Sequence, residues 1–189
     1  MPAPLSIIIP TLNAAPDFAL CLESLPGRGH QLKVGANSAR GDWLLFLHAD
    51  TVLSRDWAER VISHINTSPA RAAAFSLAFR SDAPMATTVA NRANWRARTL
   101  GLPYGDQGLL ISRDLYDEVG GYEDVPLMED VMIIRAIGKK RLSILSAQAR
   151  TSAARYERDG WHKRSWTNLT ILARFLMGAS PEKLAKAYR

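Results

Sequence analysis

Cysteine is almost absent from this chain of 189 residues, which contains Cys21 alone. A single cysteine excludes an intramolecular disulfide and a metal site built from several cysteines. This cysteine usage is typical of a reducing compartment, so we expect a cytoplasmic protein. Cys21 falls in the helical pattern "FALCLESL", which predicts a small side chain in the core.

Apolar runs long enough to cross a bilayer are also lacking. The N-terminal stretch "MPAPLSIIIPTLNAA" has no basic leader, and its apolar run stops at Pro10. We therefore expect neither a signal peptide nor a spanning helix there. With 47% hydrophobic and 22% charged residues, the composition is that of one globular domain with a sizeable core.

Positive charge is scarce in the first part of the chain and concentrated in the last. Residues 1–138 carry 12 Lys/Arg against 15 Asp/Glu, whereas residues 139–189 carry 12 against 3. The net charge of +6 therefore arises in the tail. Such a tail suits an anionic partner, either lipid or a phosphorylated substrate, and the alternative is a solvated basic helix face. Nucleic acid is not expected, because no recognised nucleic-acid module accompanies the basic residues.

Strands and helices are expected in rough alternation, which favours an α/β fold with a mostly parallel sheet flanked by helices. The segment 5–10 is β-branched and ends at Pro10, which suits a strand buried on both faces. The helix after Asp50 is expected to have Ser54 as its N-cap. Further predicted strands cover 43–48, 72–80, 108–112 and 142–151, and predicted helices cover 15–25, 31–40, 54–65, 85–99, 113–118, a segment ending near Gly138, 161–177 and a short segment opened by Pro181.

Two helices in succession, 15–25 and 31–40, interrupt this alternation. Parallel α/β folds normally place a strand between consecutive helices. A strand with its crossover helix takes about thirty residues, and the sequence lacks such a segment between Leu25 and Pro26. We expect the sheet to lack its second strand and helix, by deletion or by omission of that stretch from the sequence.

The stretch "WLLFLHADT", residues 43–51, joins a buried strand to polar side chains. Ligands of open α/β sheets bind at the carboxyl ends of the strands. In an extended segment His48 and Asp50 would point to the same side. Such a sparse donor set suits Mg²⁺ or Mn²⁺ completed by substrate phosphate. Alternatively, Asp50 starts a turn and His48 is a hydrogen-bonded core histidine.

Several motifs in order resemble the family 2 glycosyltransferases of GT-A fold. They are "SIIIPTLNAA", "GDWLLFLHADT", "PYGDQGLLISRDLYDEVGGY" and "PLMEDVMIIRAI". The likeness extends to "GASPEKLAKAY" near the end of the chain. The chain is most similar to the bacterial subfamily described as transferase 2 associated with radical-SAM and selenodomain proteins.

This resemblance implies a nucleotide-binding role for the end of the first strand, at Pro10, Thr11 and Asn13. The family's Asp-X-Asp motif corresponds to His48, Ala49 and Asp50, so Asp50 takes the role of metal ligand. His48 replaces the first aspartate and is expected at the ribose, a phosphate or the metal. The segment that recognises the nucleotide base in related enzymes has no counterpart here.

The acidic pair Glu129 and Asp130 resembles the family's catalytic acids, with Asp130 as the preferred general base. Inverting sugar transfer requires a carboxylate to take the proton of an acceptor hydroxyl. The motif "MED" follows a proline and opens an apolar helix, so one carboxylate can face a pocket. Acids stabilised by the dipole of a helix N-terminus are the alternative.

Three further segments offer contacts to a nucleotide sugar. Asp106 and Gln107 lie between glycines in "YGDQG", where they can bind sugar hydroxyls or form an Asx turn. Arg28 in "GRGHQ" is a candidate phosphate contact or an exposed loop arginine. In related enzymes C-terminal segments close over the diphosphate, a role here proposed for Arg158 and for Arg155, His162, Lys163 and Arg164. The tail also contains large apolar residues that are expected in the core or at an interface. A membrane surface is a further alternative, which would be compatible with a lipid-linked acceptor. These residues are Trp161, Trp166, Leu169, Leu172, Phe175 and Leu176.

The sequence therefore predicts one GT-A domain over 1–189, with a nucleotide- and metal-binding part (1–52), an acceptor-side part (72–135) and a basic helical tail (155–189). Its expected reaction is metal-dependent, inverting transfer of sugar from a nucleoside-diphosphate sugar to an acceptor hydroxyl. Its expected partners are that donor, an acceptor, a membrane surface met by the tail at the inner face of the cytoplasmic membrane, and a second copy of the chain. A catalytically impaired binding module and a nucleotidyltransferase are the alternatives.

Overall fold

A six-stranded mixed sheet organises the protein in the computed structural model, which describes residues 5–10 and 27–187. The strand order is β1-β2-β5-β4-β6-β3. The pairs β1–β2 and β4–β6 are parallel, whereas β2–β5, β4–β5 and β3–β6 are antiparallel. The predicted α/β class with flanking helices is confirmed, and the sheet is mixed where a mostly parallel one was expected. The strands are β1 (Leu5–Ile8), β2 (Trp43–Phe46), β3 (Val52–Leu53), β4 (Ala72–Phe79), β5 (Leu109–Ser112) and β6 (Leu142–Thr151).

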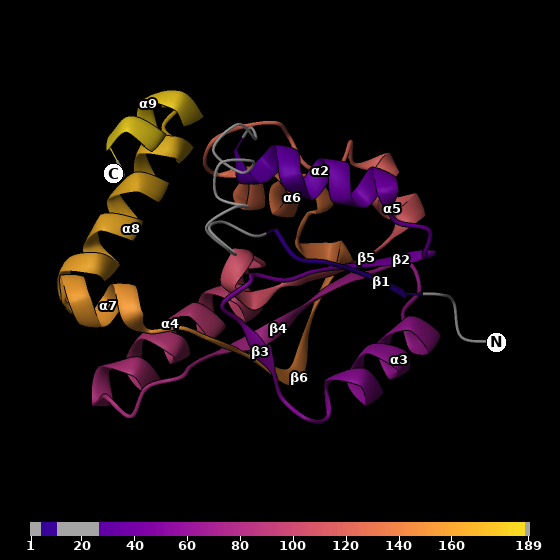
Figure 1. Cartoon of the computed structure of the whole chain (residues 1–189), viewed down its shortest axis with the longest axis horizontal. Coiled ribbons are helices and arrows are strands. Elements are labelled where there is room, and N and C mark those ends of the chain that lie inside the picture. The colour runs from indigo at the N-terminus through magenta and orange to yellow at the C-terminus, as the bar shows by residue number, and fades with distance from the viewer. Residues whose placement is uncertain (1–4, 11–26, 188–189) are drawn as a thin grey trace, which may run out of the picture.

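Helices cover both faces of this sheet (Figure 1). Helices α2, α5 and α6 pack on one face around Phe46 and Ile111, and α3 packs on the other around Phe75. Helix α4 packs on β4 and, with α7 and α8, forms a third apolar cluster around Phe79. The helices are α2 (Arg28–Ser38), α3 (Trp57–Thr67), α4 (Pro84–Leu100), α5 (Arg113–Glu118), α6 (Glu129–Ile137), α7 (Ala154–Asp159), α8 (Trp161–Leu176) and α9 (Pro181–Ala187), with 3₁₀ turns η1 (Gly105–Gln107) and η2 (Lys139–Arg141).

Strand β1 lies at the edge of the sheet. Among residues 5–10 and 27–187, no strand pairs with its outer side. Ile7 is 47% exposed and Ile9 is 49% exposed, so the prediction of a strand buried on both faces was wrong. The exposed edge agrees with the expected loss of the second strand and helix. The junction at Leu25 and Pro26, Cys21 and the predicted helix 15–25 lie outside the described residues.

Two predicted helix starts also differ from the structure. Helix α2 begins at Arg28 rather than Gln31, directly after Gly27. Helix α3 begins at Trp57 with Asp56 as its N-cap, so the prediction for Ser54 was wrong. Ser54 instead belongs to the edge of the sheet: its N–H donates to the Gln148 carbonyl at 2.9 Å, and its Oγ donates to Asp56 at 2.6 Å.

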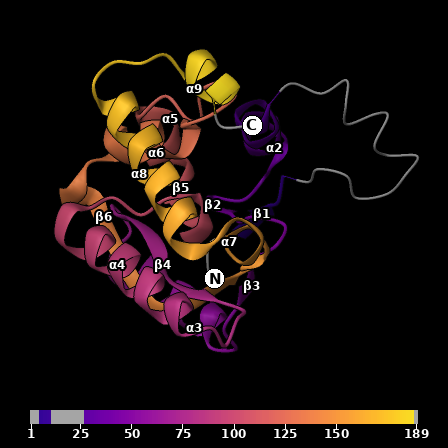
Figure 2. The same cartoon turned by 90° about the vertical axis from the view of Figure 1, so that its left-hand side faces the viewer.

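Helices α7, α8 and α9 stand at the end of the sheet where β1 and β2 finish (Figures 1 and 2). The carboxyl ends of the parallel strands β1 and β2 therefore face α7, α8 and α9, and strand ends are where ligands are expected in α/β sheets.

No helix in the described part of the chain is long and apolar enough to cross a membrane.

Candidate active site

The site begins where β2 ends. The Leu47 N–H donates to the Ile8 carbonyl at 3.0 Å, which holds this segment beside β1. The chain then turns, because the Thr51 N–H donates to the His48 carbonyl at 3.1 Å. The extended geometry predicted for 48–50 was therefore wrong. Asp50 lies in the turn and is exposed, whereas His48 is half-buried and has different neighbours.

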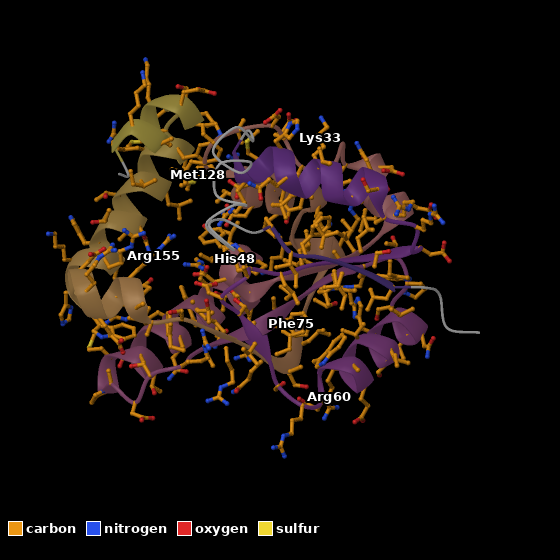
Figure 3. The ribbon with its side chains drawn as sticks, in the orientation of Figure 1. Lys33, His48, Arg60, Phe75, Met128 and Arg155 are labelled. Carbon is orange, nitrogen blue, oxygen red and sulfur yellow. The ribbon has the colours of Figure 1, made fainter. Side chains whose placement is uncertain are left out.

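His48 connects two charged side chains. Its Nε2 lies 3.1 Å from Nη1 of Arg28, and its Nδ1 lies 3.2 Å from Oδ1 of Asp106. A guanidinium can only donate, so Nε2 must accept and the ring proton of the neutral imidazole belongs on Nδ1. That proton points to the Asp106 carboxylate, which fixes the orientation of the ring. Figure 3 shows His48 on the side of the molecule that faces helices α7 and α8.

The acidic pair opens helix α6 after a strained residue. Met128 has φ 72°, the only positive φ at a non-glycine position in the described ranges. A methionine in the left-handed region is unfavourable and persists only where its surroundings enforce it, which is frequent at functional sites. This turn sends Glu129 inward, where it is 1% exposed and forms an ion pair with Nε of Arg28. Asp130 remains half-buried and accepts from the Gly105 N–H at 2.8 Å.

Gly105 brings the η1 backbone against these groups. A Cβ at this position would lie 2.5 Å from Nε2 of His48 and 3.2 Å from Oδ2 of Asp130. The first distance is shorter than any real Cβ contact, so only glycine fits without displacing His48. The backbone of the loop "YGDQG" thus packs closely against His48 and Asp130.

The charges of the site shift its pKa values in opposite directions. Burial alone would raise the pKa of Asp106, but the hydrogen bond from His48 and the positive charges of Arg28 and Arg155 lower it below the usual range. Burial raises the pKa of Glu129, against the opposing effect of Arg28. Burial would lower the pKa of Arg28, but the carboxylates around it raise it, so this guanidinium stays charged.

A pocket opens above these groups, with an unsatisfied hydroxyl in its wall. The Tyr104 ring lies under the guanidinium of Arg96, 4.0 Å from ring centroid to Cζ. The buried Tyr104 hydroxyl has no hydrogen-bond partner among the described residues, which is unusual for a buried polar group and suits a site that takes a polar ligand. The wall comprises Arg28, Leu32, Phe46, Leu47, His48, Tyr104, Gly105, Gly108, Leu109, Tyr122, Glu129, Asp130 and Ile134. Sequence reasoning missed Tyr104, Arg96 and Tyr122, because only their spatial proximity distinguishes them.

Asp50 has the chemistry of a sparse cation ligand. One carboxylate oxygen has a long contact of 3.4 Å with the Thr151 hydroxyl, and the neighbouring Thr51 hydroxyl is buried without a partner in the part of the chain described. Within that part, no three His, Cys, Asp or Glu side chains gather closely enough to hold a metal. One carboxylate fits a Mg²⁺ or Mn²⁺ ion that keeps its waters and takes further oxygens from a diphosphate.

The remaining predicted residues are not gathered at this pocket. Gln107 is buried below it, and its Nε2 donates to the Phe75 carbonyl at 2.9 Å. Arg158 is exposed and pairs with the adjacent Asp159. Arg155, one turn earlier in α7, has a positive charge that lowers the pKa of Asp106. In Figure 3 it lies on the side of α7 that faces His48.

The structure describes only part of the segment after β1 that is predicted to bind the nucleotide. Pro10 is half-buried two residues after β1 ends. Thr11 and Asn13 lie outside the described residues. Of the predicted site, the structure therefore brings together Arg28, His48, Asp106, Glu129 and Asp130.

Comparison with known proteins places the chain in a family. The family described as Glycosyl transferase family 2 matches residues 25–121, about half of the chain. No curated protein matches the chain. The matched region contains Arg28, His48, Asp50 and Asp106.

Solved structures share the fold at low sequence identity. The chain is similar to a structure described as mannosyltransferase PcManGT from Pyrobaculum calidifontis in complex with GDP-Man and Mn²⁺, with a TM-score of 0.63, 13% identity, and coverage of 100% of this chain and 68% of that chain. It is also similar to S. aureus TarS 1-349, with a TM-score of 0.54, 14% identity, and coverage of 77% and 60%. The TarS complex with UDP-GlcNAc gives a TM-score of 0.55 at 13% identity, with coverage of 78% and 58%. The chain therefore spans about 60% of the length of the TarS structures.

The site thus lies in an α/β protein with the GT-A fold, at the strand ends where ligands are expected in α/β sheets. The chain belongs to glycosyltransferase family 2.

Proposed function

We propose that this protein transfers a sugar from a nucleoside-diphosphate sugar to an acceptor hydroxyl, with a divalent cation and inversion at the anomeric carbon. The observation that carries the proposal is the meeting of Asp130, His48 and the Arg28–Glu129 pair in one pocket at the strand ends of a family 2 chain. Its similarity to solved structures holding GDP-Man with Mn²⁺ and UDP-GlcNAc supports the donor class. Within the family we propose the radical-SAM and selenodomain-associated subfamily, on the motifs quoted above.

Asp130 is the proposed general base. It lines the pocket, and the Gly105 N–H holds one of its carboxylate oxygens. In the reaction the acceptor hydroxyl loses its proton to Asp130 while its oxygen forms a bond to the anomeric carbon. The bond from that carbon to the diphosphate oxygen breaks on the opposite face. Glu129 is too deeply buried and too firmly paired with Arg28 to serve as this base.

The positive charges of the site are proposed to bind the diphosphate. Arg28 reaches the pocket wall, and Arg155 faces it from α7. A cation held by Asp50 would neutralise the charge that develops on the leaving diphosphate. His48 orients Arg28 through Nε2, so in this arrangement the imidazole holds a phosphate-binding group instead of ligating the cation. Pro10, Thr11 and Asn13 are proposed at the nucleotide.

The test is donor turnover with UDP-GlcNAc and GDP-mannose in the presence of Mn²⁺. Asp130→Asn should lower turnover by about 10² to 10⁴-fold, because a general base contributes that much, while nucleotide binding measured by calorimetry should persist. In Asp50→Ala, donor turnover should no longer be stimulated by Mn²⁺. Asp114→Asn, an exposed acid on α5, is the matched control and should be unaffected.

Other outcomes would redirect the proposal. Tight binding of UDP or GDP without turnover would favour a binding module derived from a transferase, an alternative motivated by the edge of β1 that no other described strand covers. Release of pyrophosphate with formation of a sugar nucleotide would identify a nucleotidyltransferase. Unchanged turnover in Asp130→Asn would refute the assignment of the base.

A further inference from the structure

Helix α8 exposes large apolar side chains. Trp166 is 68% exposed, Leu169 54%, Leu176 52% and Met177, which follows the helix, 78%. Single exposed apolar residues are ordinary on protein surfaces, but a contiguous group marks an interaction site. Figure 2 shows α8 running across the face turned to the viewer, on the outside of the molecule.

Trp166, Leu169 and Leu176 share one face of the helix, and Met177 continues that face directly after the last turn. Leu169, Leu176 and Met177 follow Trp166 by 3, 10 and 11 residues. Because a helix has 3.6 residues per turn, residues at these spacings lie on nearly the same side. Ile171, the buried residue of α8, lies on the opposite side. The helix therefore has one apolar face toward the protein and a second one toward solvent, which we name the α8 stripe.

Basic side chains flank the α8 stripe. Helical spacing puts the exposed Lys163 and Arg174 along one of its borders. Arg164 instead points toward the protein, 3.6 Å from the carboxylate of Asp159. Helix α9 adds the exposed Lys183 and Lys186, against Glu182 as the only acidic residue from Trp161 to Ala187.

We propose that the α8 stripe docks this protein on the surface of an anionic lipid bilayer. An apolar face containing tryptophan and bordered by Lys and Arg is the pattern of a helix that lies in the membrane interface. The basic border attracts anionic headgroups, and the Trp, Leu and Met side chains enter the boundary of the acyl chains. A symmetric dimer through the same stripe would bring two copies of this basic border together, which is unfavourable.

Docking in this way would bring the pocket close to the bilayer. Helices α7 and α8 stand next to the strand ends, and Arg155 faces the site from α7. An acceptor carried on a lipid would then reach the site without leaving the membrane. The docking itself does not depend on the proposed reaction, because none of its residues contacts the pocket.

The experiment is co-sedimentation of the whole chain with vesicles of phosphatidylcholine alone and of phosphatidylcholine containing phosphatidylglycerol. We expect binding to the anionic vesicles, at least tenfold weaker binding to neutral ones, and a loss in high salt. Arg174→Glu with Lys183→Glu should weaken binding by more than about 25-fold, since each basic residue near an anionic surface contributes roughly fivefold. Trp166→Ser with Leu169→Ser should also weaken it by tenfold or more.

A matched control comes from α4, where Trp95 is also exposed but stands among polar neighbours. Trp95→Ser should bind vesicles like the wild type. Circular dichroism melts establish that each variant folds, and donor turnover without vesicles should be the same in all of them, so failure of docking and failure of the proposed reaction are told apart.

Two outcomes overturn the proposal. One is sedimentation that does not depend on vesicles or on their charge. The other is a dimer, measured by light scattering, that dissociates in Trp166→Ser with Leu169→Ser while the wild type ignores vesicles. The second outcome would assign the α8 stripe to a second copy of the chain.

Discussion

Removing the positive charge of Arg28 should destabilise the protein in a pH-dependent way. Arg28→Met leaves the Glu129 carboxylate buried at 1% exposure without its ion-pair partner. Breaking a fully buried pair costs about 3–5 kcal/mol. The Arg28 side chain is 37% exposed, so solvent weakens the pair and we expect about 2–4 kcal/mol near pH 8. In a protein of this size that loss lowers the melting temperature by roughly 4–16 °C.

The direction of the pH effect follows from the pKa of Glu129. Burial already raises this pKa, and loss of Arg28 removes the effect that opposes the rise. When a carboxyl group has a higher pKa in the folded state than in the unfolded state, the protein becomes less stable as the pH rises from the unfolded pKa value to the folded one. The penalty of Arg28→Met should therefore be largest in mildly alkaline solution and shrink as the pH falls toward the ordinary pKa of glutamate.

Denaturant unfolding of the wild type, Arg28→Met, Glu129→Gln and the double variant at about pH 8 and about pH 5 tests this reasoning. Glu129→Gln removes the buried charge, so in the Arg28→Met background it should restore more than half of the lost stability at pH 8. An equal loss at both pH values, or no rescue by Glu129→Gln, would show that Arg28 contributes packing and not charge compensation.

Three further predictions concern other parts of the chain. Gly105→Ala should lower donor turnover at least tenfold with little loss of stability, because its Cβ displaces His48, which is 2.5 Å away. His64 has a pKa lowered by burial, so the wild type should lose stability as pH falls below about 6.5, and His64→Gln should flatten that dependence in thermal melts. Asn94 bridges the Leu77 N–H and carbonyl at 2.7 and 2.9 Å, so Asn94→Leu should cost about 2–4 kcal/mol in denaturant unfolding.

Each of these predictions has a result that would contradict it. Normal turnover in Gly105→Ala would mean that η1 moves away without consequence for the site. Equal pH dependence with and without His64 would assign the acid sensitivity to the carboxylates. For Asn94 the control is Asn91→Ala, an exposed position on the same helix. Equal free energies of unfolding for Asn94→Leu and Asn91→Ala would show that the hydrogen bonds to Leu77 contribute little.

Local sequence patterns predicted most of the elements, because side-chain periodicity acts within each segment. The strands β4 and β6 and helix α5 lie where apolar spacing placed them. The mixed order of the sheet was missed because strand direction depends on long-range pairing, such as Trp43 opposite Ser112, which periodicity does not encode. The edge position of β1 was missed for the same reason, although the absence of its neighbouring strand was visible in the sequence.

Several residues proposed for the site lie close together in the structure, but the sequence did not predict the contacts among them. Family motifs and the rule of strand ends pointed to His48, Asp106 and Asp130, and these do converge. Nothing local in the sequence shows that Arg28, twenty residues before His48, would bind its ring, or that Met128 would adopt a left-handed conformation. These features arise from tertiary packing, which overrides what each short segment prefers alone.

The connected charges offer a physical reason for a histidine at position 48, where the resemblance places the first aspartate of the family's motif. A continuous chain of contacts links Glu129, Arg28, His48 and Asp106. Arg28 pairs with the carboxylate of Glu129, and the imidazole of His48 lies between Arg28 and the carboxylate of Asp106. An aspartate at position 48 would face Asp106 as a like charge, and its shorter side chain would no longer support both neighbours. Asp106 already supplies the carboxylate from a different loop, so His48 keeps that negative charge in the site and at the same time orients the arginine. Asp50 is then left as the one acidic residue of the motif with an oxygen available for a cation.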